Sequence, residues 1–255
     1  MARNRWGAIL TAMTSNPLND VLSMISSVTN DGEIPIVVFD LDSTLLRSGH
    51  RHLAILRDFV GATAVRSGAS WDQLRELVPT LSPADFGYNI SDPLIRAGIN
   101  DKSQRHDLGR FWSKRYFTSA FCLHDEPAPG AVTYAQAVHD AGALVWYLTG
   151  RPHASMLEGT TENLGRHGFP LGGPRTRLEL RPARFSGDKG FKVVAAEAIT
   201  KVGPVVAQFE NEPANANAML PIFPDALHFI VGHVHSSAPD RPHPSLIPID
   251  DFVLR

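Results

Sequence analysis

Short runs of apolar residues recur along the chain, and several of them end in polar residues. Runs of this length suit strands that are buried on both faces of a parallel sheet. Segments with helical spacing of apolar residues lie between them, so strands and helices alternate, as in parallel α/β sheets. The expected strands are 36–39, 143–148, 176–181, 204–209 and 227–231, and the expected helices that separate them are 131–141, 154–168, 188–199 and 214–220.

The stretch between the first two expected strands has no strand pattern. It contains apolar residues at helical spacing and turn signals, so we expect a mainly helical insertion with helices near 52–60, 71–77, 93–97 and 108–116. Residues 1–33 predict one or two short helices that pack on the core. We therefore predict a helical extension at 1–33, a three-layer Rossmann-like α/β core at 34–46 and 126–255, and a helical cap at 47–125.

Composition excludes several classes of protein. The chain has 255 residues, of which 43% are hydrophobic and 20% are charged, and its net charge of -2 argues against a general nucleic-acid binder. No apolar stretch reaches the roughly 18 residues that a membrane span needs, and no signal peptide is expected. The single cysteine, Cys122, fits a reducing compartment. We expect a cytoplasmic protein that binds neither nucleic acid nor membrane, and its oligomeric state stays open.

Two aspartates follow the first expected strand, in the sequence Asp40-Leu41-Asp42-Ser43-Thr44. Ligands of open α/β sheets bind at the carboxyl ends of the strands, so both carboxylates would face a crevice there. One of the two can act as nucleophile or metal ligand while the other transfers protons. The alternative is an ordinary turn, because aspartate is common in turns.

Polar residues also follow the later strands. The expected strand at 143–148 runs into Thr149-Gly150, the strand at 204–209 runs into Glu210-Asn211-Glu212, and the helix that starts near residue 188 supplies Lys189 and Lys192. Each feature has a structural explanation, as a helix cap, a polar loop or a solvated charge. Together, however, a carboxylate pair, a hydroxyl, an ammonium and oxygen ligands for a hard cation fit phosphoryl transfer.

These stretches resemble the motifs of the haloacid-dehalogenase-like (HAD) hydrolase superfamily. Asp40-Leu41-Asp42-Ser43-Thr44-Leu45 is similar to motif I and Thr149-Gly150-Arg151 to motif II. A lysine that opens a helix is similar to motif III, and Phe209-Glu210-Asn211-Glu212-Pro213 stands where motif IV belongs. Order and spacing fit across residues 36–215. The resemblance implies a phosphatase-type protein with a C1 cap inserted after the first core strand.

The resemblance also implies a role for each residue. Asp40 would be the nucleophile, which forms an aspartyl-phosphate, and a Mg²⁺ ligand. Asp42 would be the general acid/base, with its backbone carbonyl on the metal, and Thr149 would hold the phosphate. The motif III lysine would neutralise charge. Lys192 is favoured for it because it lies well inside the amphipathic helix, and Lys189 stays an alternative.

Further residues are expected at the same site: Ser43, Thr44, Gly150, Arg151 and Lys189 near the substrate, and Glu210 and Asn211 at the metal. Motif IV departs from the usual aspartates, since a glutamate stands there and an asparagine follows it. The predicted function is a Mg²⁺-dependent phosphomonoester hydrolase acting on a small phosphorylated metabolite. A phosphomutase and a non-catalytic ligand-binding member of the fold are the alternatives.

Overall fold

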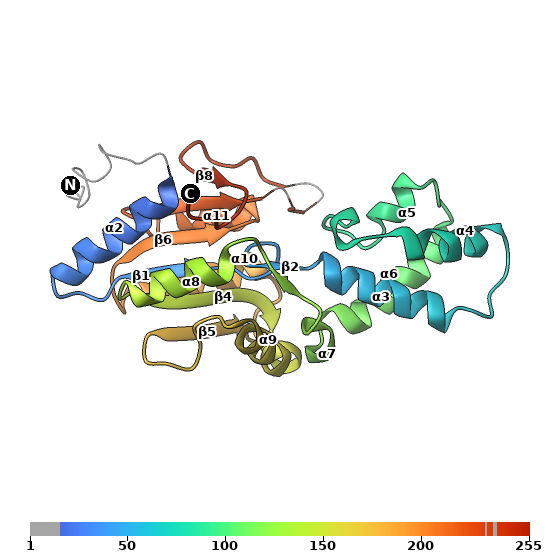
Figure 1. Cartoon of the computed structure of the whole chain (residues 1–255), viewed down its shortest axis with the longest axis horizontal. Coiled ribbons are helices and arrows are strands. Elements are labelled where there is room, and N and C mark those ends of the chain that lie inside the picture. Colours follow the sequence, from blue (N-terminus) through green and yellow to red (C-terminus); the bar gives the residue numbers. More distant parts are fainter. Residues whose placement is uncertain (1–15, 233, 237–238) are drawn as a thin grey trace. The chain divides into compact units, whose positions relative to one another are not determined.

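Two compact units make up the computed structural model, which describes residues 16–232, 234–236 and 239–255 (Figure 1). The α/β unit comprises Met1–Leu46, Pro127–His153 and Leu164–Arg255. The helical unit comprises Arg47–Glu126 and Ala154–Asn163. Two short strands, β2 (Leu46–Arg47) and β3 (Glu126–Pro127), pair where the chain passes between the units.

Residues 154–163, which we expected in the core, instead group with the helical unit. They form most of helix α9 (His153–His167), and Gly159 lies directly against the backbone of Ser119 in helix α7 (Ser119–Cys122). The Ser119 hydroxyl accepts a hydrogen bond from the Gly159 amide at 3.0 Å and donates one to the Ser155 carbonyl at 3.1 Å. The periodicity of residues 154–168 predicts a helix. It does not predict the close contact between Gly159 and Ser119, which packs α9 against α7 of the helical unit.

Six parallel strands form the sheet of the α/β unit, in the order β5-β4-β1-β6-β7-β8. The predicted α/β fold with a parallel sheet is therefore confirmed. The strands are β1 (Ile36–Phe39), β4 (Leu144–Pro152), β5 (Thr176–Arg181), β6 (Val205–Glu210), β7 (Leu227–Val231) and β8 (Ile247–Ile249). We did not expect β8, because it has three residues and contains Pro248; proline cannot donate to a ladder and is tolerated at an edge such as this.

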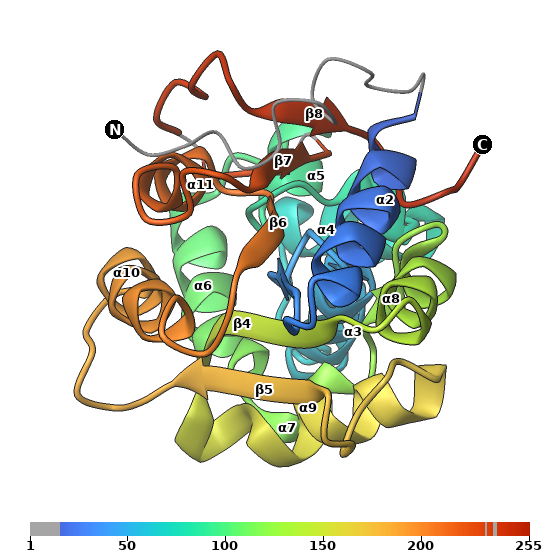
Figure 2. The same ribbon diagram turned by 90° about the vertical axis from the view of Figure 1, so that its left-hand side faces the viewer.

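Helices cover both faces of this sheet (Figure 2). Side chains alternate along β1, so that Val37 and Phe39 face one cluster while Ile36 and Val38 face the other. Helices α2 (Pro17–Asn30) and α8 (Ala131–Asp140) pack on the first face, and α10 (Asp188–Ile199) and α11 (Pro213–Met219) on the second. Four consecutive buried residues in β1 thus result from a sheet that is covered on both sides.

An aromatic row crosses the sheet next to the carboxyl ends of the strands. Phe39 of β1 stacks on Phe209 of β6, with ring centroids 4.9 Å apart, and Phe209 stacks on Phe229 of β7 at 4.4 Å. The three residues are register partners in neighbouring strands. Asp40 and Glu210 directly follow Phe39 and Phe209, so the aromatic row fixes the two positions from which these carboxylates project.

The register between β1 and β6 shifts by one residue near its start. Ile36 pairs with Val205, but Val37 pairs with Ala207, so Val206 is an extra residue in β6. Beyond the shift the pairing is regular, and Phe39 lies opposite Phe209. The Asp40 amide donates to the Phe209 carbonyl at 3.0 Å, which continues the ladder one step past β1.

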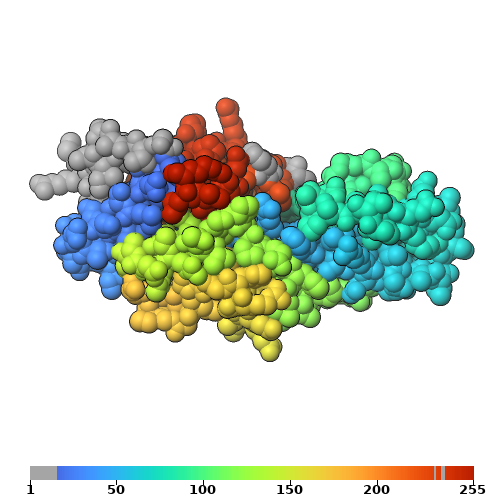
Figure 3. Space-filling model, in the orientation of Figure 1, coloured from blue at the N-terminus to red at the C-terminus, as the bar shows by residue number. Residues whose placement is uncertain are grey.

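The N-terminal helix α2 is part of the core of the α/β unit. Val21, Met24, Ile25 and Val28 recur at helical spacing and are all fully buried. The side chain of Asn16 caps the helix by accepting the Leu18 amide at 3.0 Å. The outer surfaces of α2 and α8 lie side by side on this unit (Figure 3). Residues 1–15 of the predicted extension lie outside the described residues.

The helical unit has a hydrophobic core of its own. Leu53, Ile55, Leu56 and Phe59 of the first helix pack against apolar residues from the other helices. Its elements are α3 (Gly49–Ala62), α4 (Ala69–Leu77), α5 (Asp92–Arg96), α6 (Lys102–Tyr116) and α7, with 3₁₀ turns at Val78–Thr80 and Pro83–Asp85. Helix α6 begins six residues before the expected start at 108, because its first turn is polar and therefore lacks an apolar pattern.

A buried ion pair links the beginning and the end of the helical unit. Arg51 of α3 and Asp125 are both fully buried, and the guanidinium Nε donates to Asp125 Oδ1 at 2.9 Å. The same guanidinium lies over the Tyr116 ring, 4.4 Å from its centroid. Removing one partner would leave an uncompensated buried charge, so the pair fixes how this unit closes.

Among the described residues, no helix is long and apolar enough to cross a bilayer.

A substitution at Gly130 would test how closely the backbone segments of the α/β unit are packed. Its φ is +75°, and a Cβ would lie 2.5 Å from the Phe252 carbonyl carbon and 2.6 Å from its oxygen. We expect Gly130→Ala to lower the free energy of unfolding by about 1–3 kcal/mol, measured from urea unfolding curves. The matched control is Gly165→Ala in α9, where a Cβ meets no heavy atom within 4 Å and little loss is expected. Equal losses in both variants would contradict this account.

Candidate active site

Asp40 lies at the carboxyl end of β1, where the chain turns back on itself. The amides of Thr44 and Leu46 both donate to the Leu41 carbonyl, at 3.2 and 2.8 Å. Ser43, half-buried at this turn, has a φ of +60°, in the left-handed region. The turn brings the Thr44 hydroxyl to 2.9 Å from Asp40 Oδ2, so that Thr44 orients the carboxylate rather than facing solvent.

Lys192 is the central cation of the site. Its side chain is 2% exposed, and Nζ donates to Asp40 Oδ1 and to Glu210 Oε2, both at 2.7 Å. Asp188, one turn earlier on α10, places Oδ2 3.4 Å from the same ammonium. One lysine therefore contacts carboxylates from the ends of β1 and β6 and from its own helix.

This arrangement shifts the ionisation of all three buried groups. Burial raises the pKa of Asp40; the Lys192 ammonium opposes this shift and the Asp188 carboxylate adds to it. Burial and the nearby Asp40 carboxylate raise the pKa of Glu210 to about 8. Burial alone would lower the pKa of Lys192, but Asp188, Asp40 and Glu210 raise it well above its usual value. Lys192 therefore stays positively charged, and Asp40, Glu210 and Asp188 all interact with this one charge.

Lys189, the alternative lysine, lies outside this cluster. Its side chain is 58% exposed, and its nearest acidic partner is Asp240 at 3.9 Å. The two lysines are three residues apart on α10, and only the face that carries Lys192 turns towards the strand ends. Of these two lysines, Lys192 is the one that contacts Asp40 and Glu210.

Motif II continues a strand instead of following one. Strand β4 extends to Pro152, so Thr149 and Gly150 lie within it, where its pairing with β5 becomes irregular. The buried Thr149 hydroxyl accepts the Arg151 amide at 3.3 Å. A Cβ on Gly150 would collide with the Asp188 carboxylate, which explains a glycine at this position.

Arg151, which we expected near the substrate, is bound to Asp42. Its Nε donates to Asp42 Oδ2 at 2.8 Å and its Nη2 donates to Oδ1 at 2.9 Å. The Arg151 side chain is 1% exposed, whereas that of Asp42 is 29% exposed. The second aspartate of motif I is therefore held by a buried arginine from the neighbouring strand.

Asp188 is a site residue that the sequence reasoning missed. Besides its approach to Lys192, its Oδ2 accepts a hydrogen bond from Asn215 Nδ2 at 2.8 Å. Its Oδ1 is buried without a hydrogen-bond partner in the part of the chain that is described. A signal was available, because Asp188 and Lys192 are four residues apart in a helix and so share one face.

Asn211 faces Asp40 across the Thr44 hydroxyl, which is 3.4 Å from Asn211 Oδ1. Asn211 Nδ2 donates to the Val234 carbonyl at 2.6 Å, which fixes the amide with its oxygen turned inward. The Glu210 carboxylate has different partners, since Oε2 accepts from Lys192 and Oε1 accepts the Glu212 amide at 3.1 Å. Asn211 Oδ1 therefore shares the Thr44 hydroxyl with Asp40 Oδ2, whereas Glu210 Oε2 shares the Lys192 ammonium with Asp40 Oδ1.

The donors on this side are oxygens, as a hard cation requires. In the described ranges, no three side chains of His, Cys, Asp or Glu come together as a metal cage. Mg²⁺ in phosphoryl-transfer sites is commonly held by one or two carboxylates, with water and substrate phosphate completing its shell. Asp40 and Asn211 both offer oxygen atoms, as that pattern requires. Together they supply one negative charge, whereas two carboxylates would supply two.

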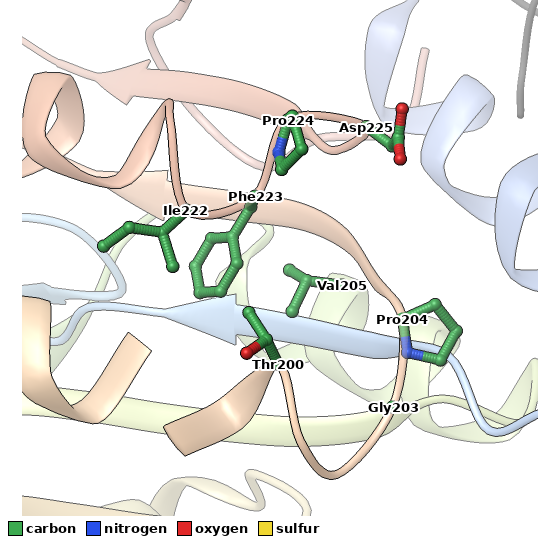
Figure 4. Close-up of a pocket in the computed structure, with 8 residues that line it drawn as sticks. All are labelled: Thr200, Gly203, Pro204, Val205, Ile222, Phe223, Pro224 and Asp225. Carbon is green, nitrogen blue, oxygen red and sulfur yellow. The ribbon is translucent and has the colours of Figure 1, made fainter. Parts of the chain in front are cut away.

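A separate cavity of about 240 Å³ lies at the opposite end of β6 (Figure 4). The side chains of Val205, Ile222 and Phe223 form its apolar wall. Val205 is the first residue of β6 and Glu210 is the last, so this cavity does not join the cluster around Lys192.

Comparison with known proteins gives matches to solved structures only. No protein-family model matches the chain, and no curated protein matches it. Its fold is similar to that of a haloacid dehalogenase-like hydrolase from Streptococcus pneumoniae (12% identity, 78% of this chain and 84% of that chain, TM-score 0.46). It is also similar to β-phosphoglucomutase from Clostridium difficile (13%, 86% and 92%, 0.44) and to CbbY from Rhodobacter sphaeroides in complex with phosphate (16%, 86% and 95%, 0.48).

The first of these proteins carries the name of the superfamily that the motifs resemble. At identities of 12–16%, an activity does not transfer from one protein to another.

The raised pKa of Glu210 predicts how stability depends on pH. Its value of about 8 in the folded protein exceeds its ordinary value of 4.5, so the stability it contributes is complete below pH 4.5 and is lost as pH rises towards 8. Gln mimics the protonated acid. We expect Glu210→Gln to be as stable as the wild type at low pH and progressively more stable up to pH 8, in urea unfolding with EDTA. Parallel pH curves for the two proteins would contradict this.

Proposed function

We propose that this protein is a Mg²⁺-dependent phosphomonoester hydrolase that works through an aspartyl-phosphate on Asp40. The observation that carries the proposal is the placement of the Asp40 carboxylate at the end of β1, held by Lys192 and Thr44, with a second carboxylate at Asp42. A fixed carboxylate beside a buried ammonium is suited to attack a phosphorus atom, because the cation offsets the negative charge of the phosphoryl group.

Two displacements complete the proposed reaction. A carboxylate oxygen of Asp40 bonds to phosphorus, and the bond from phosphorus to the leaving oxygen breaks. Water then attacks the same phosphorus, Asp42 accepts a proton from that water, and the bond to Asp40 breaks to release inorganic phosphate. The Thr149 hydroxyl accepts one hydrogen bond from the Arg151 amide and can donate another to a phosphate oxygen.

Asp40 and Asn211, with the backbone carbonyl of Asp42 that the motif resemblance implies, would hold the metal. Bound Mg²⁺ would supply a positive charge that orients the phosphoryl oxygens and stabilises them during transfer. The proposed substrate is a small phosphorylated metabolite. A phosphomutase would share the aspartyl-phosphate but return the phosphoryl group to the substrate.

The function is tested by phosphate release from a panel of phosphate monoesters in Mg²⁺, with the wild type and Asp40→Asn. We expect the wild type to release phosphate and the variant to lose at least about 10³-fold in kcat/KM, because the nucleophile is absent. Isomerised substrate with little free phosphate would indicate a phosphomutase instead. Release that survives Asp40→Asn, or no turnover of any ester together with no binding of Mg²⁺ or vanadate, would overturn the proposal.

Asn211 gives a test of the metal site that does not depend on turnover. Asn211→Asp adds a negative charge on the side of Asp40, so we expect Mg²⁺ to bind about tenfold more tightly, measured by isothermal titration calorimetry. Asn217→Asp on α11 is the matched control, because its amide hydrogen-bonds to the Arg241 carbonyl, outside the cluster. An equal gain in both variants would show only a general charge effect, and no gain at Asn211 would contradict the assignment.

A further inference from the structure

Two adjacent side chains of motif IV hold a short segment of the chain that follows β7. Asn211 Nδ2 donates to the Val234 carbonyl at 2.6 Å, and the Glu212 carboxylate accepts two hydrogen bonds from Ser236. Oε2 accepts the Ser236 amide at 2.9 Å, and Oε1 accepts its hydroxyl at 2.8 Å. One side chain thus donates to the segment and its neighbour accepts from it two residues further on, which fixes both the position and the direction of residues 234–236.

The backbone of Glu212 is itself anchored on both sides. Its amide donates to Glu210 Oε1 at 3.1 Å, and its carbonyl accepts the Asn215 and Ala216 amides, both at 3.0 Å. The Glu212 side chain does not cap helix α11, whose first turn is fully described, and is directed to Ser236 instead. The carboxylate therefore reaches the segment from a backbone that these hydrogen bonds hold in place.

The Val234 carbonyl determines how the buried Asn211 amide is oriented. A carbonyl oxygen can only accept, so the amide presents Nδ2 to Val234 and turns Oδ1 the other way. Oδ1 lies 3.4 Å from the Thr44 hydroxyl, which is 2.9 Å from Asp40 Oδ2. The direction in which Asn211 offers its oxygen thus depends on where the Val234 carbonyl is held.

We propose that Glu212 is a positioning residue for the metal site. It holds residues 234–236 in place, and the Val234 carbonyl then keeps Asn211 Oδ1 directed to the side of Asp40. The second acid of motif IV therefore acts on the metal through Asn211 and does not bind it. Replacing a residue that orients a metal ligand commonly costs about 10–100-fold in metal affinity. This inference rests on the proposed function and adds a residue and a loop to its metal site.

The first test measures Mg²⁺ affinity by isothermal titration calorimetry, without substrate. Glu212→Ala removes both acceptors, and we expect it to weaken Mg²⁺ binding by about tenfold. Glu212→Gln should stay within about threefold of the wild type, because its amide oxygen can accept the Ser236 amide and its NH₂ group can donate to the Ser236 hydroxyl. Equal losses in the two variants would indicate a direct ligand or a general effect of charge, and would overturn the inference.

Asn217→Ala is the matched control. Asn217 of α11 also makes two hydrogen bonds to the chain after β7, since Nδ2 donates to the Arg241 carbonyl at 2.9 Å and Oδ1 accepts the His243 amide at 2.9 Å. Its replacement should leave the Mg²⁺ affinity unchanged, because Val234 keeps its position. A loss as large as that of Glu212→Ala would show only that this part of the chain had been loosened, and would contradict a specific role for Glu212.

A double-mutant cycle tests whether Glu212 acts through Asn211. The carboxylate of Asn211→Asp cannot donate to the Val234 carbonyl, so the segment no longer orients this side chain. Glu212→Ala added to Asn211→Asp should therefore weaken Mg²⁺ binding by less than about twofold. The full loss in that background as well would show that Glu212 acts independently of Asn211, and the inference would be wrong.

A spectroscopic measurement needs no metal. The side-chain NH₂ signals of Asn211 in heteronuclear NMR spectra are identified by their loss in Asn211→Asp. In Glu212→Ala they should move towards the values of solvent-exposed asparagines, whereas in Glu212→Gln and Asn217→Ala they should stay in place. Unchanged signals in Glu212→Ala would contradict the inference.

Ser236→Ala replaces Glu212→Ala if that variant fails to fold. It loses the hydroxyl that donates to Glu212, so the Asn211 signals should shift in the same direction, and unchanged signals would overturn the inference. A wild type that binds no Mg²⁺ would overturn the proposed function, and the inference with it. A wild type that binds Mg²⁺ no more tightly than Glu212→Ala would overturn the inference alone.

Discussion

The site depends on the ion pairs that the buried Lys192 ammonium forms with Asp40 and Glu210. Asp40 and Glu210 come from the ends of two neighbouring strands, and both would be unfavourable in the interior without a cation between them. Lys192 compensates them from the facing helix α10, while Asp188 on that helix competes for the same charge. The sheet, the helix and the ionisation of the acids are thus linked through one atom, Nζ, whose positive charge the fold holds in place.

Much of the fold follows from local patterns in the sequence. Four of the five longer strands of the sheet contain apolar runs, whereas β5 alternates polar and apolar residues, and all five were expected at their positions. Lys192, which the sequence favoured over Lys189, is the lysine that contacts Asp40. Strand β8 was not predictable in this way, because three residues with a central proline carry no period. The Asp42–Arg151 pair was also missed, since residues 109 positions apart meet only when β1 and β4 lie side by side. The local sequence predicts where helices and strands form, whereas contacts between residues that are distant in the chain depend on which strands pair.

The two aspartates of motif I occupy different electrostatic surroundings although they are two residues apart. Asp40 shares a buried lysine with other acids, whereas Asp42 forms an ion pair with the buried Arg151. Pairs of carboxylates whose surroundings differ in this way are how one site separates a nucleophile from a proton-transfer group.

The register shift at the start of β6 has a consequence at the other end of the strand. If the pairing of Ile36 with Val205 ran on without the shift, Phe39 would lie opposite Gln208, and Glu210 would turn to the other face relative to Asp40. Lys192 could not then reach both acids, and the aromatic row would be broken as well. The one-residue shift, far from any reacting atom, therefore sets which side chains of the two strands share a face.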